Sequence, residues 1–308
     1  MQIELTREES FTVRAGAKAI HGMRHIGEWN GLVELQDAAG LMLILNEGQI
    51  VKGSAELLQL LRPVSAGFVP VPGMVFPPSK ALPNGLTVPA FYVAQHATTQ
   101  GADGKISHDP ALYPWVNINF YKAMEACNAA GYIGIRESQW LAIAANAAQQ
   151  DCNWTGGKVG EGDLFQGIRN GGCARSGNYV PANETERRWL MLSNGSKVCD
   201  FNGNVFQWVF DDIQGDERGL ITKPFDAESP SIALAPYPSE QKGMGYRPSA
   251  GRDWSGYALV RGGFWYSDDY AGVFYLYGGR PDYGGVGLGF RCTLPMDSDP
   301  RSLVTAKL

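Results

Sequence analysis

A recognition-type composition fills residues 261–292, which read RGGFWYSDDYAGVFYLYGGRPDYGGVGLGFRC. Between Gly262 and Phe290 the chain uses no Lys, Glu, Gln or Met, although all four occur elsewhere. Tyr, Ser and Gly are enriched in antibody binding loops, because Tyr offers a large contact area for two torsions and small polar residues hydrogen-bond adaptably. The segment also lacks helical or strand periodicity. These residue types predict molecular recognition and do not indicate a catalytic centre.

The genetic code gives the same positions a second interpretation. If a codon AAY has only its adenines randomised, it can encode Tyr, Ser, Asp, Gly, Val, Phe, Leu or Asn, but never Lys, Glu, Gln, Met or Trp. We predict that the positions that fit this rule form a variable, ligand-binding surface: Phe264, Tyr266, Ser267, Asp268, Asp269, Tyr270, Tyr275, Tyr277, Gly278, Gly279, Tyr283, Gly285, Val286 and Gly287. The alternative is a loop rich in Gly and Tyr on an ordinary lectin-like domain.

Fixed residues are expected to frame the variable positions. Trp265 and Phe274 are predicted to point into the core, where large aromatic side chains contribute most of their burial energy. Arg261 and Arg291 flank the segment, and each guanidinium offers five donors in a rigid arrangement that can hold loop carbonyls in place.

Other residues give little support for metal or redox chemistry. The five cysteines are spread out and include no C-x-x-C pair, so neither a zinc site nor a disulfide framework is predicted; they are Cys127, Cys152, Cys173, Cys199 and Cys292. Free buried thiols in a reducing cytoplasm are expected, with a single disulfide left open. His21 and His25 have the spacing of a helical metal pair, but no carboxylate lies between them to complete the motif.

Composition excludes several classes of protein. The chain has 308 residues, 44% of them hydrophobic and 19% charged, which is typical of a globular protein of about two domains. A net charge of −5 without a basic run argues against nucleic-acid binding. No apolar stretch approaches the roughly 20 residues of a membrane helix, and the first residues lack a secretory signal. We therefore expect synthesis in the cytoplasm and no membrane insertion.

Four parts are predicted along the chain. Residues 1–66 form a small, mainly β unit for attachment or oligomerisation, with strand-like runs at 31–36 and 41–45 and a helix at 54–61 capped by Ser54. Residues 67–85 are a proline-rich linker, residues 86–293 are the ligand-binding domain, and residues 294–308 are a tail. Residues 86–293 show helices amid many short strands and glycine-rich loops, an α+β pattern.

Several motifs in this domain resemble the formylglycine-generating (sulfatase-modifying) enzyme family. The motifs are LTVPAFYV at 86–93, PWVNINFYKAMEAC at 114–127, GYIGIRESQWLAIA at 131–144, DFNGNVFQW at 200–208, LVRGG at 259–263 and GFR at 289–291. This resemblance implies a C-type-lectin-like fold. It also implies that residues 114–127 lead into a first helix and that residues 131–144 contain a second.

The same resemblance bears on activity and on calcium. The family's enzymes need a cysteine pair close to the GFR block, and this chain has no cysteine between Cys199 and Cys292, so we expect no enzyme activity. The family's DFNGNVFQW-like loop binds calcium, which makes calcium a candidate cofactor, though none is required. The positions that match are Asp200, Gly203, Val205 and Gln207. The alternative is a turn held by hydrogen bonds of Asn202 and Asn204.

The RGG-x-W, AGVF and GFRC blocks also resemble the variable proteins of diversity-generating retroelements. This resemblance implies a macromolecular ligand, usually a protein on another cell or virion surface, and display of this chain on a virion or cell. The alternative is a catalytically inactive relative of the sulfatase-modifying enzymes that serves as a structural or carbohydrate-binding module. The ligand and the oligomeric state are left open.

Overall fold

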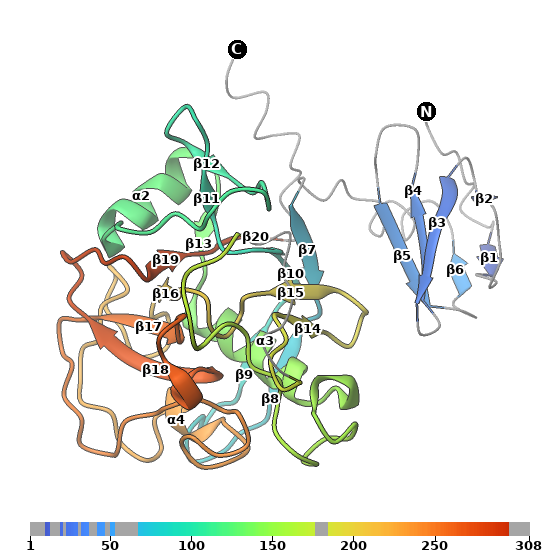
Figure 1. Ribbon diagram of the computed structural model, residues 1–308. Coiled ribbons are helices and arrows are strands. Elements are labelled where there is room, and N and C mark those ends of the chain that lie inside the picture. The colour runs from blue at the N-terminus through green and yellow to red at the C-terminus, as the bar shows by residue number, and fades with distance from the viewer. Residues whose placement is uncertain are drawn as a thin grey trace. The chain divides into compact units, whose positions relative to one another are not determined.

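The computed structural model describes residues 67–175 and 184–295 with their side chains, and strands β1 to β6 of the N-terminal part as backbone (Figure 1). The chain divides into two compact units, Met1–Ala66 with Asp297–Leu308, and Gly67–Met296. The helix predicted over residues 54–61 lies outside the described residues. Within the described ranges, every helix is too short or too polar to cross a bilayer.

The elements described in the N-terminal unit are all strands. One antiparallel sheet has the order β2-β3-β4-β5, with bounds Ala19–Ile20, Met23–Trp29, Leu32–Gln36 and Met42–Asn46. A second pair joins β1 (Ser10–Thr12) to β6 (Ile50–Lys52). Strands β4 and β5 pair with Gln36 opposite Met42, which confirms the strand pairing predicted from the two apolar runs.

A four-stranded sheet closes the larger unit by bringing its last strand beside one of its first. The strands are β7 (Phe68–Val71), β10 (Phe91–Ala94), β13 (Ile133–Gly134) and β20 (Cys292–Pro295), in the order β13-β20-β10-β7. All neighbours in this sheet run antiparallel. The last residue of the GFRC block, Cys292, is the first residue of β20, so the block ends in this sheet.

Two predicted boundaries are corrected by these strands. Residues 67–85 do not form a linker, since β7 pairs with β10 and β8 (Met74–Phe76) pairs with β9 (Leu86–Val88). Proline-rich sequence is compatible with β7 because an edge strand leaves part of its backbone unpaired. The predicted tail likewise begins too early, because Leu294 and Pro295 belong to β20.

A second four-stranded sheet carries the segment at 261–292. Its order is β18-β17-β16-β19, with bounds Gly272–Gly279, Ala258–Gly262, Phe206–Val209 and Leu288–Phe290. Strands β16 and β19 run parallel, whereas the other neighbours are antiparallel. Two further pairs join β11 (Thr99–Gln100) to β12 (Ile106–Ser107), and β14 (Trp189–Met191) to β15 (Lys197–Cys199).

Helices α2 (Phe120–Ala129) and α3 (Glu137–Ala148) lie where the sequence predicts them. Helix α2 begins after Asn119, whose side chain caps it by accepting from the Lys122 amide at 2.9 Å. Shorter elements are α4 (Pro230–Ala233) and the 3₁₀ turns η1 (Asp151–Asn153) and η2 (Asp268–Tyr270). The α+β class is therefore confirmed.

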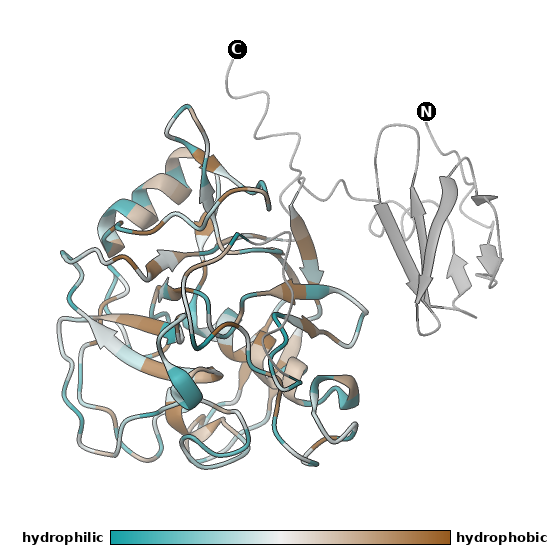
Figure 2. Cartoon of the chain, viewed as in Figure 1, coloured by the Kyte–Doolittle hydropathy of each residue, from teal (hydrophilic) through white to brown (hydrophobic). Residues whose placement is uncertain are grey.

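The hydrophobic core of the larger unit gathers around α3. Trp140 is fully buried and stacks on Phe201 with 3.9 Å between ring centroids. Phe274 and Leu276 of β18 belong to the same core cluster. Figure 2 shows hydrophobic stretches along α3 and the sheets, with hydrophilic colours mainly on the connecting loops. The strand that carries variable positions is thus anchored in the core by alternate residues.

Candidate ligand-binding surface

The register between β17 and β18 makes the predicted segment project from the sheet. Arg261 pairs with Leu276, but the next residue, Gly262, pairs with Gly272, so the pairing shifts abruptly there. Gly262 and Gly263 have φ values of 89° and 83°, in the region that favours glycine. The RGG block therefore provides the bend that sends residues 264–271 outward, and η2 lies on this excursion.

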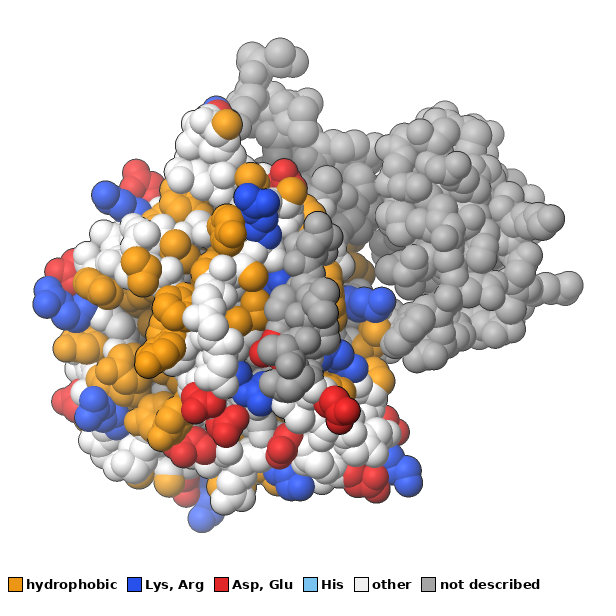
Figure 3. Space-filling model, viewed as in Figure 1, with side chains coloured by type: hydrophobic (Ala, Val, Ile, Leu, Met, Phe, Trp, Pro, Cys, Tyr) orange, Lys and Arg blue, Asp and Glu red, His pale blue; other side chains and the backbone are white. Residues whose placement is uncertain are grey.

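Most of the large variable side chains are exposed. The exposed fractions are 74% for Tyr266, 52% for Tyr270, 42% for Tyr277, 61% for Tyr283 and 66% for Val286. Asp268 and Asp269 of η2 are exposed as well. Figure 3 shows hydrophobic side chains gathered on the face over β17 and β18, with acidic side chains beside them. The exposed set of seven side chains is called the variable patch below.

Several other predicted positions lie deeper than expected. Tyr275 is only 7% exposed, in contrast to Tyr277, and burial raises the pKa of its hydroxyl. Ser267 is also 7% exposed, and its Oγ accepts from the Phe264 amide at 2.9 Å. Ser267 therefore shapes the turn. The remaining positions are buried or half-buried: Phe264, Gly278, Gly279, Gly285 and Gly287.

Two of these glycines face fixed tryptophans. A Cβ on Gly278 would lie 2.5 Å from Trp254 Cγ, and a Cβ on Gly279 would lie 2.7 Å from Trp208 Cζ3. Trp208 is fully buried and its Nε1 donates to the Ile118 carbonyl at 2.9 Å, so it has little room to move. Packing therefore accounts for both glycines, and neither offers a side chain to a ligand.

An aromatic network joins the variable positions to fixed residues that the sequence analysis missed. Phe206 stacks on Phe264 at 4.3 Å and lies 5.3 Å from Tyr275. Tyr246 lies 6.0 Å from Tyr275 and 6.2 Å from Tyr270, measured between ring centroids. Tyr275 thus packs between Phe206 and Tyr246, beneath the exposed side chains. Nothing in the sequence around Tyr246 indicated this role, because it lies outside every motif.

Fixed side chains hold the backbone of the segment. Gln166 Nε2 donates to the carbonyls of Asp269 at 3.2 Å and Ala271 at 2.5 Å. Trp140 Nε1 donates to the Val273 carbonyl at 2.7 Å. These bonds end on main-chain oxygens, which every residue type supplies. These bonds therefore do not depend on the side chain at Asp269, whereas the turn at 264–267 does use the side chain of Ser267.

Arg261 continues this pattern, as predicted. Its Nη1 donates to the Phe274 and Tyr275 carbonyls at 3.1 and 3.2 Å. Its other nitrogens pair with Glu137, which is fully buried and also accepts from Ser231 Oγ at 2.6 Å. Arg291, by contrast, donates to carbonyls of the 94 and 199–200 backbone and does not touch the variable positions.

The two aspartates of η2 interact with a neighbouring loop. Arg169 Nε lies 3.3 Å from Asp269 Oδ1, and Asn170 Nδ2 donates to Asp268 Oδ1 at 3.1 Å. The Asp268 amide also donates to the Arg169 carbonyl at 2.9 Å. Arg169 therefore partly neutralises the acidic side of the variable patch, which reduces any simple charge preference for a ligand.

The two aromatic residues expected in the core differ from each other. Phe274 is fully buried, as predicted. Trp265 is only half-buried, and its ring lies 5.3 Å from Phe264 and 5.8 Å from Tyr266. The reason is that β17 ends at Gly262 and the chain has already left the sheet at Trp265. Its amide nevertheless donates to the Asn204 carbonyl at 3.1 Å, which fixes the start of the excursion.

The candidate calcium positions form a buried hydrogen-bonded cluster that does not fit a calcium ion. The Asp200 carboxylate pairs with Arg188 through both oxygens, and both side chains are fully buried. Gln207 Nε2 donates to the Asp200 carbonyl at 2.7 Å. The Gly203 carbonyl accepts from the Val205 amide at 2.9 Å. These oxygens already accept from N–H donors. Across the described ranges, no group of three or more His, Cys, Asp or Glu residues is arranged to hold a metal.

Two cysteines lie side by side in the core. The Sγ atoms of Cys127 and Cys292 are 3.4 Å apart, and Thr98 Oγ1 lies 3.4 Å from Cys292 Sγ. Both thiols are fully buried, and the hydrogen bond between the two thiols together with burial raises the pKa of Cys127. A protonated, inaccessible thiol is a poor nucleophile.

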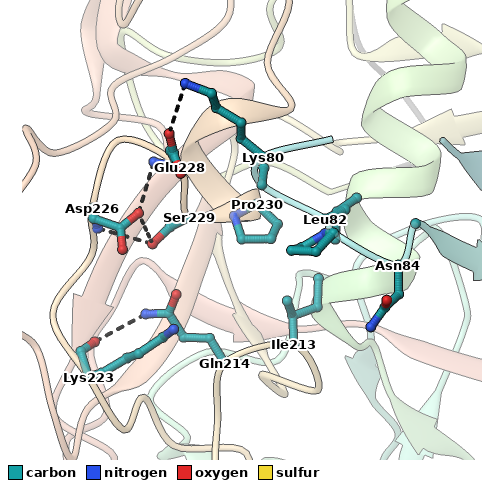
Figure 4. A pocket seen from close by; sticks show the side chains of 13 residues that line it. Lys80, Leu82, Asn84, Ile213, Gln214, Lys223, Asp226, Glu228, Ser229 and Pro230 are labelled. Carbon is teal, nitrogen blue, oxygen red and sulfur yellow. Dashed lines mark hydrogen bonds and ion pairs between the residues drawn. The ribbon is translucent and has the colours of Figure 1, made fainter. Parts of the chain in front are cut away.

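A separate hollow of about 390 Å³ lies between the 80–85 loop and residues 213–230 (Figure 4). None of its lining residues belongs to the segment at 261–292. Some of its lining residues interact with one another: Lys80 Nζ lies 3.7 Å from Glu228 Oε1, and Gln214 Nε2 donates to the Lys223 carbonyl at 3.1 Å. The hollow is polar and open, and no buried reactive group lines it.

Comparison with known families places the larger unit. Residues 68–295 match the Sulfatase-modifying factor enzyme 1-like domain. The chain belongs to this family. The match spans both four-stranded sheets of the larger unit and starts at β7, in agreement with the corrected domain boundary. A comparison with curated protein sequences gives no match.

Solved structures show weaker similarity. Treponema denticola variable protein 1 is 15% identical, with a TM-score of 0.39, and covers 74% of this chain and 94% of its own. CarF is 13% identical, with a TM-score of 0.41 and coverage of 75% and 98%. The Major Tropism Determinant I1 variant is 10% identical, with a TM-score of 0.34 and coverage of 92% and 85%. These scores are too low to establish a shared fold, so the assignment rests on the domain match.

Proposed function

We propose that the chain is a ligand-binding protein whose recognition surface is the variable patch, and that a diversity-generating retroelement varies this surface. One observation carries the proposal: the segment exposes variable side chains to solvent, while fixed residues hydrogen-bond to its main-chain carbonyls. Tyr266, Tyr270 and Tyr277 face solvent. Gln166 and Arg261 donate to this segment only through its main-chain oxygens.

This arrangement suits a surface that must change its sequence and keep its shape. Substitutions confined to exposed side chains usually alter stability by about 0.5 kcal/mol or less. Exposed tyrosines supply large amphipathic contact area, and aromatic residues dominate binding hot spots, with losses of about 2 kcal/mol or more on truncation. The patch therefore combines tolerance to variation with residues that give strong contacts.

The ligand that suits the patch is a macromolecule, for which we propose a surface protein of another cell or virion. The patch is spread over η2, β18 and the 281–287 loop, so it offers a broad face. Display of the chain on a virion or cell surface, with residues 1–66 as the attachment unit, follows from this proposal.

A binding role is favoured over catalysis by the state of the thiols. The family's enzymes use cysteine, and here Cys127, Cys199 and Cys292 are fully buried, with the pKa of Cys127 and of Cys199 raised. Cys173 is half-buried, and burial raises its pKa to about 11. Cys152 is exposed but lies in η1, far in sequence from the GFR block.

The test is to sequence the DNA that flanks the gene. A retroelement requires a reverse transcriptase gene and a near-identical repeat of the segment with AAY codons at the variable positions. We expect AAY in the repeat opposite Tyr266, Asp268, Asp269, Tyr270 and Tyr277, and an unchanged codon opposite Phe274. A locus without a repeat or reverse transcriptase would overturn diversification and favour the inactive structural or carbohydrate-binding module.

A further inference from the structure

The buried cluster at Asp200 already contains a cation. Asp200 lies at the end of β15 and both its carboxylate oxygens accept from Arg188, Oδ1 from Nε at 2.6 Å and Oδ2 from Nη2. Asn204 Nδ2 adds a bond of 2.9 Å to Oδ2, and Arg188 Nη1 donates to the Arg175 carbonyl at 2.7 Å. The guanidinium is therefore surrounded by oxygens, as a bound metal ion would be.

A second guanidinium occupies the other side of the cluster. Arg291 Nε donates to Gln207 Oε1 at 2.8 Å, and its Nη2 donates to the carbonyls of Cys199 at 2.7 Å and Asp200 at 3.1 Å. The Gln207 amide oxygen, a candidate calcium ligand, thus accepts from a guanidinium nitrogen.

Charge balance disfavours a metal ion in addition. Arg188 and Arg291 are fully buried; among the described residues Arg188 pairs with the Asp200 carboxylate, and Arg291 donates to the Asp200 main-chain carbonyl. Two like unit charges 4 Å apart repel by about 4 kcal/mol at an effective dielectric constant of about 20, and a divalent ion doubles that figure for each guanidinium. Calcium also requires six to eight oxygen ligands, and the Asp200 carboxylate, Gln207 Oε1 and the Gly203 carbonyl already accept from nitrogen donors here.

We propose that the Arg188 guanidinium takes the place of a divalent cation in this loop, so that the chain presents its variable segment without calcium. The loop that Arg188 holds is joined to the start of that segment. The Gly203 amide donates to the Gly262 carbonyl at 3.0 Å, and the Trp265 amide donates to the Asn204 carbonyl at 3.1 Å. An internal cation therefore replaces an exchangeable one at the base of the variable patch.

The first experiment measures calcium dependence directly. The full-length protein is melted in excess EDTA and in millimolar calcium chloride, and calcium chloride is titrated into it in a calorimeter. The proposal predicts the same melting midpoint in both buffers and no saturable heat. A midpoint that calcium raises by several degrees, or a saturable heat of binding, would overturn it.

The second experiment tests the role of the guanidinium. Arg188→Met leaves a buried carboxylate without its partner, so the midpoint is expected to fall by about 6 °C or more in either buffer. Arg218→Met is the matched control, because the Arg218–Asp216 pair is exposed on the arginine side, and its midpoint should hold. An Arg188→Met midpoint equal to that of the control would contradict the proposal.

A third variant distinguishes a cation position from an ordinary ion pair. Arg188→Ser combined with Gln207→Glu removes the guanidinium and adds a carboxylate, so calcium should now raise the midpoint relative to EDTA. If this double variant folds and shows no calcium dependence, the guanidinium does not occupy a cation position. If it does not fold in either buffer, the calcium titration of the natural protein decides.

Discussion

At the scale of single residues, Arg261 holds the main chain of the segment and leaves its variable side chains uncontacted. Its donors reach two main-chain oxygens of β18 and the buried Glu137 carboxylate, yet no variable side chain. A guanidinium is suited to this because its fork reaches several acceptors at fixed angles. Glu137 and Arg261 are both fully buried, so the pair has no solvent to replace a lost partner.

Arg261→Met is expected to lower the free energy of unfolding by about 3–5 kcal/mol, because it leaves the Glu137 charge buried without a partner. Arg280→Met is the control within the same segment. Arg280 pairs with Asp282 at 3.0 Å while both side chains are largely exposed, so its loss should change stability by about 0.5 kcal/mol or less. Urea unfolding of both variants checks the difference, and equal losses would contradict the assigned role.

The glycines of the variable set should differ in how well they tolerate substitution. Gly279→Ser places a Cβ against the buried Trp208 ring and is expected to destabilise the domain by about 1–3 kcal/mol. Gly285→Ser meets only the Tyr283 ring, 3.2 Å away, and Tyr283 is exposed and can move. Its effect should stay within about 0.5 kcal/mol. Thermal melts of the two variants test this, and a Gly279→Ser variant as stable as Gly285→Ser would show that Trp208 yields.

At the scale of elements, η2 and β18 should respond differently to substitution. Tyr266→Ser, Asp268→Asn, Asp269→Asn and Tyr270→Phe together change only exposed side chains and keep a side-chain oxygen for Arg169 and Asn170, so the urea midpoint should barely move. Asn suits position 268 because Asp268 has a φ of 50° there. Phe274→Ala in β18 should cost about 3–5 kcal/mol through loss of a core aromatic. A collapsed quadruple variant beside a stable Phe274→Ala variant would reverse the assignment.

Sequence reasoning located these elements better than it located individual side chains. Codon composition marked Phe264 and residues 266–270 as one group, but only the fold shows that Ser267 turns inward and accepts from the Phe264 amide. Tyr275 and Tyr277 look alike in sequence and share one face of β18, yet Tyr275 is covered by Phe206 and Tyr246. Burial of that kind depends on residues distant in the chain, and no local pattern encodes it.

The domain boundaries show the same limit. The prolines of residues 67–85 are typical of an extended linker. This segment is extended, but its first part forms the edge strand β7, where proline is tolerated. The two helices were predicted from the family resemblance of residues 114–127 and 131–144, which contain the starts of α2 and α3. Long-range pairing of β20 with β10 had no such local signal.

At the scale of the whole molecule, the buried His96 and the half-buried His108 make stability depend on pH. Burial lowers the pKa of both His96 and His108 from 6.5 to about 4. Arg291 adds to the lowering at both, and Asp200 partly opposes it at His96. The unfolded chain therefore binds protons first as pH falls below 6.5, so stability present above that pH is lost down to about pH 4.

Asp211 acts in the opposite direction, because burial raises its pKa from 3.8 to about 6. Between these two pH values the folded carboxyl is protonated and the unfolded one is not, so stability rises as pH falls. The three groups together predict a loss of about 1.4 kcal/mol per pH unit between about pH 6 and pH 4. Urea unfolding across this range measures it. Asp211→Asn should steepen the slope and His108→Phe should flatten it. A flat profile for the natural protein would contradict the pKa values.

The central claim is that exposed and buried members of the predicted variable set have different roles. Two display libraries with randomised NNY codons test it against one probe, purified lysozyme. The first library varies Tyr266, Asp268, Asp269, Tyr270, Tyr277, Tyr283 and Val286; the second varies Ser267, Tyr275, Gly278, Gly279 and Gly287. We predict that the first library stays protease-resistant and yields lysozyme binders, while the second loses its folded fraction and yields none. A second library that folds and binds as well as the first would contradict the claim.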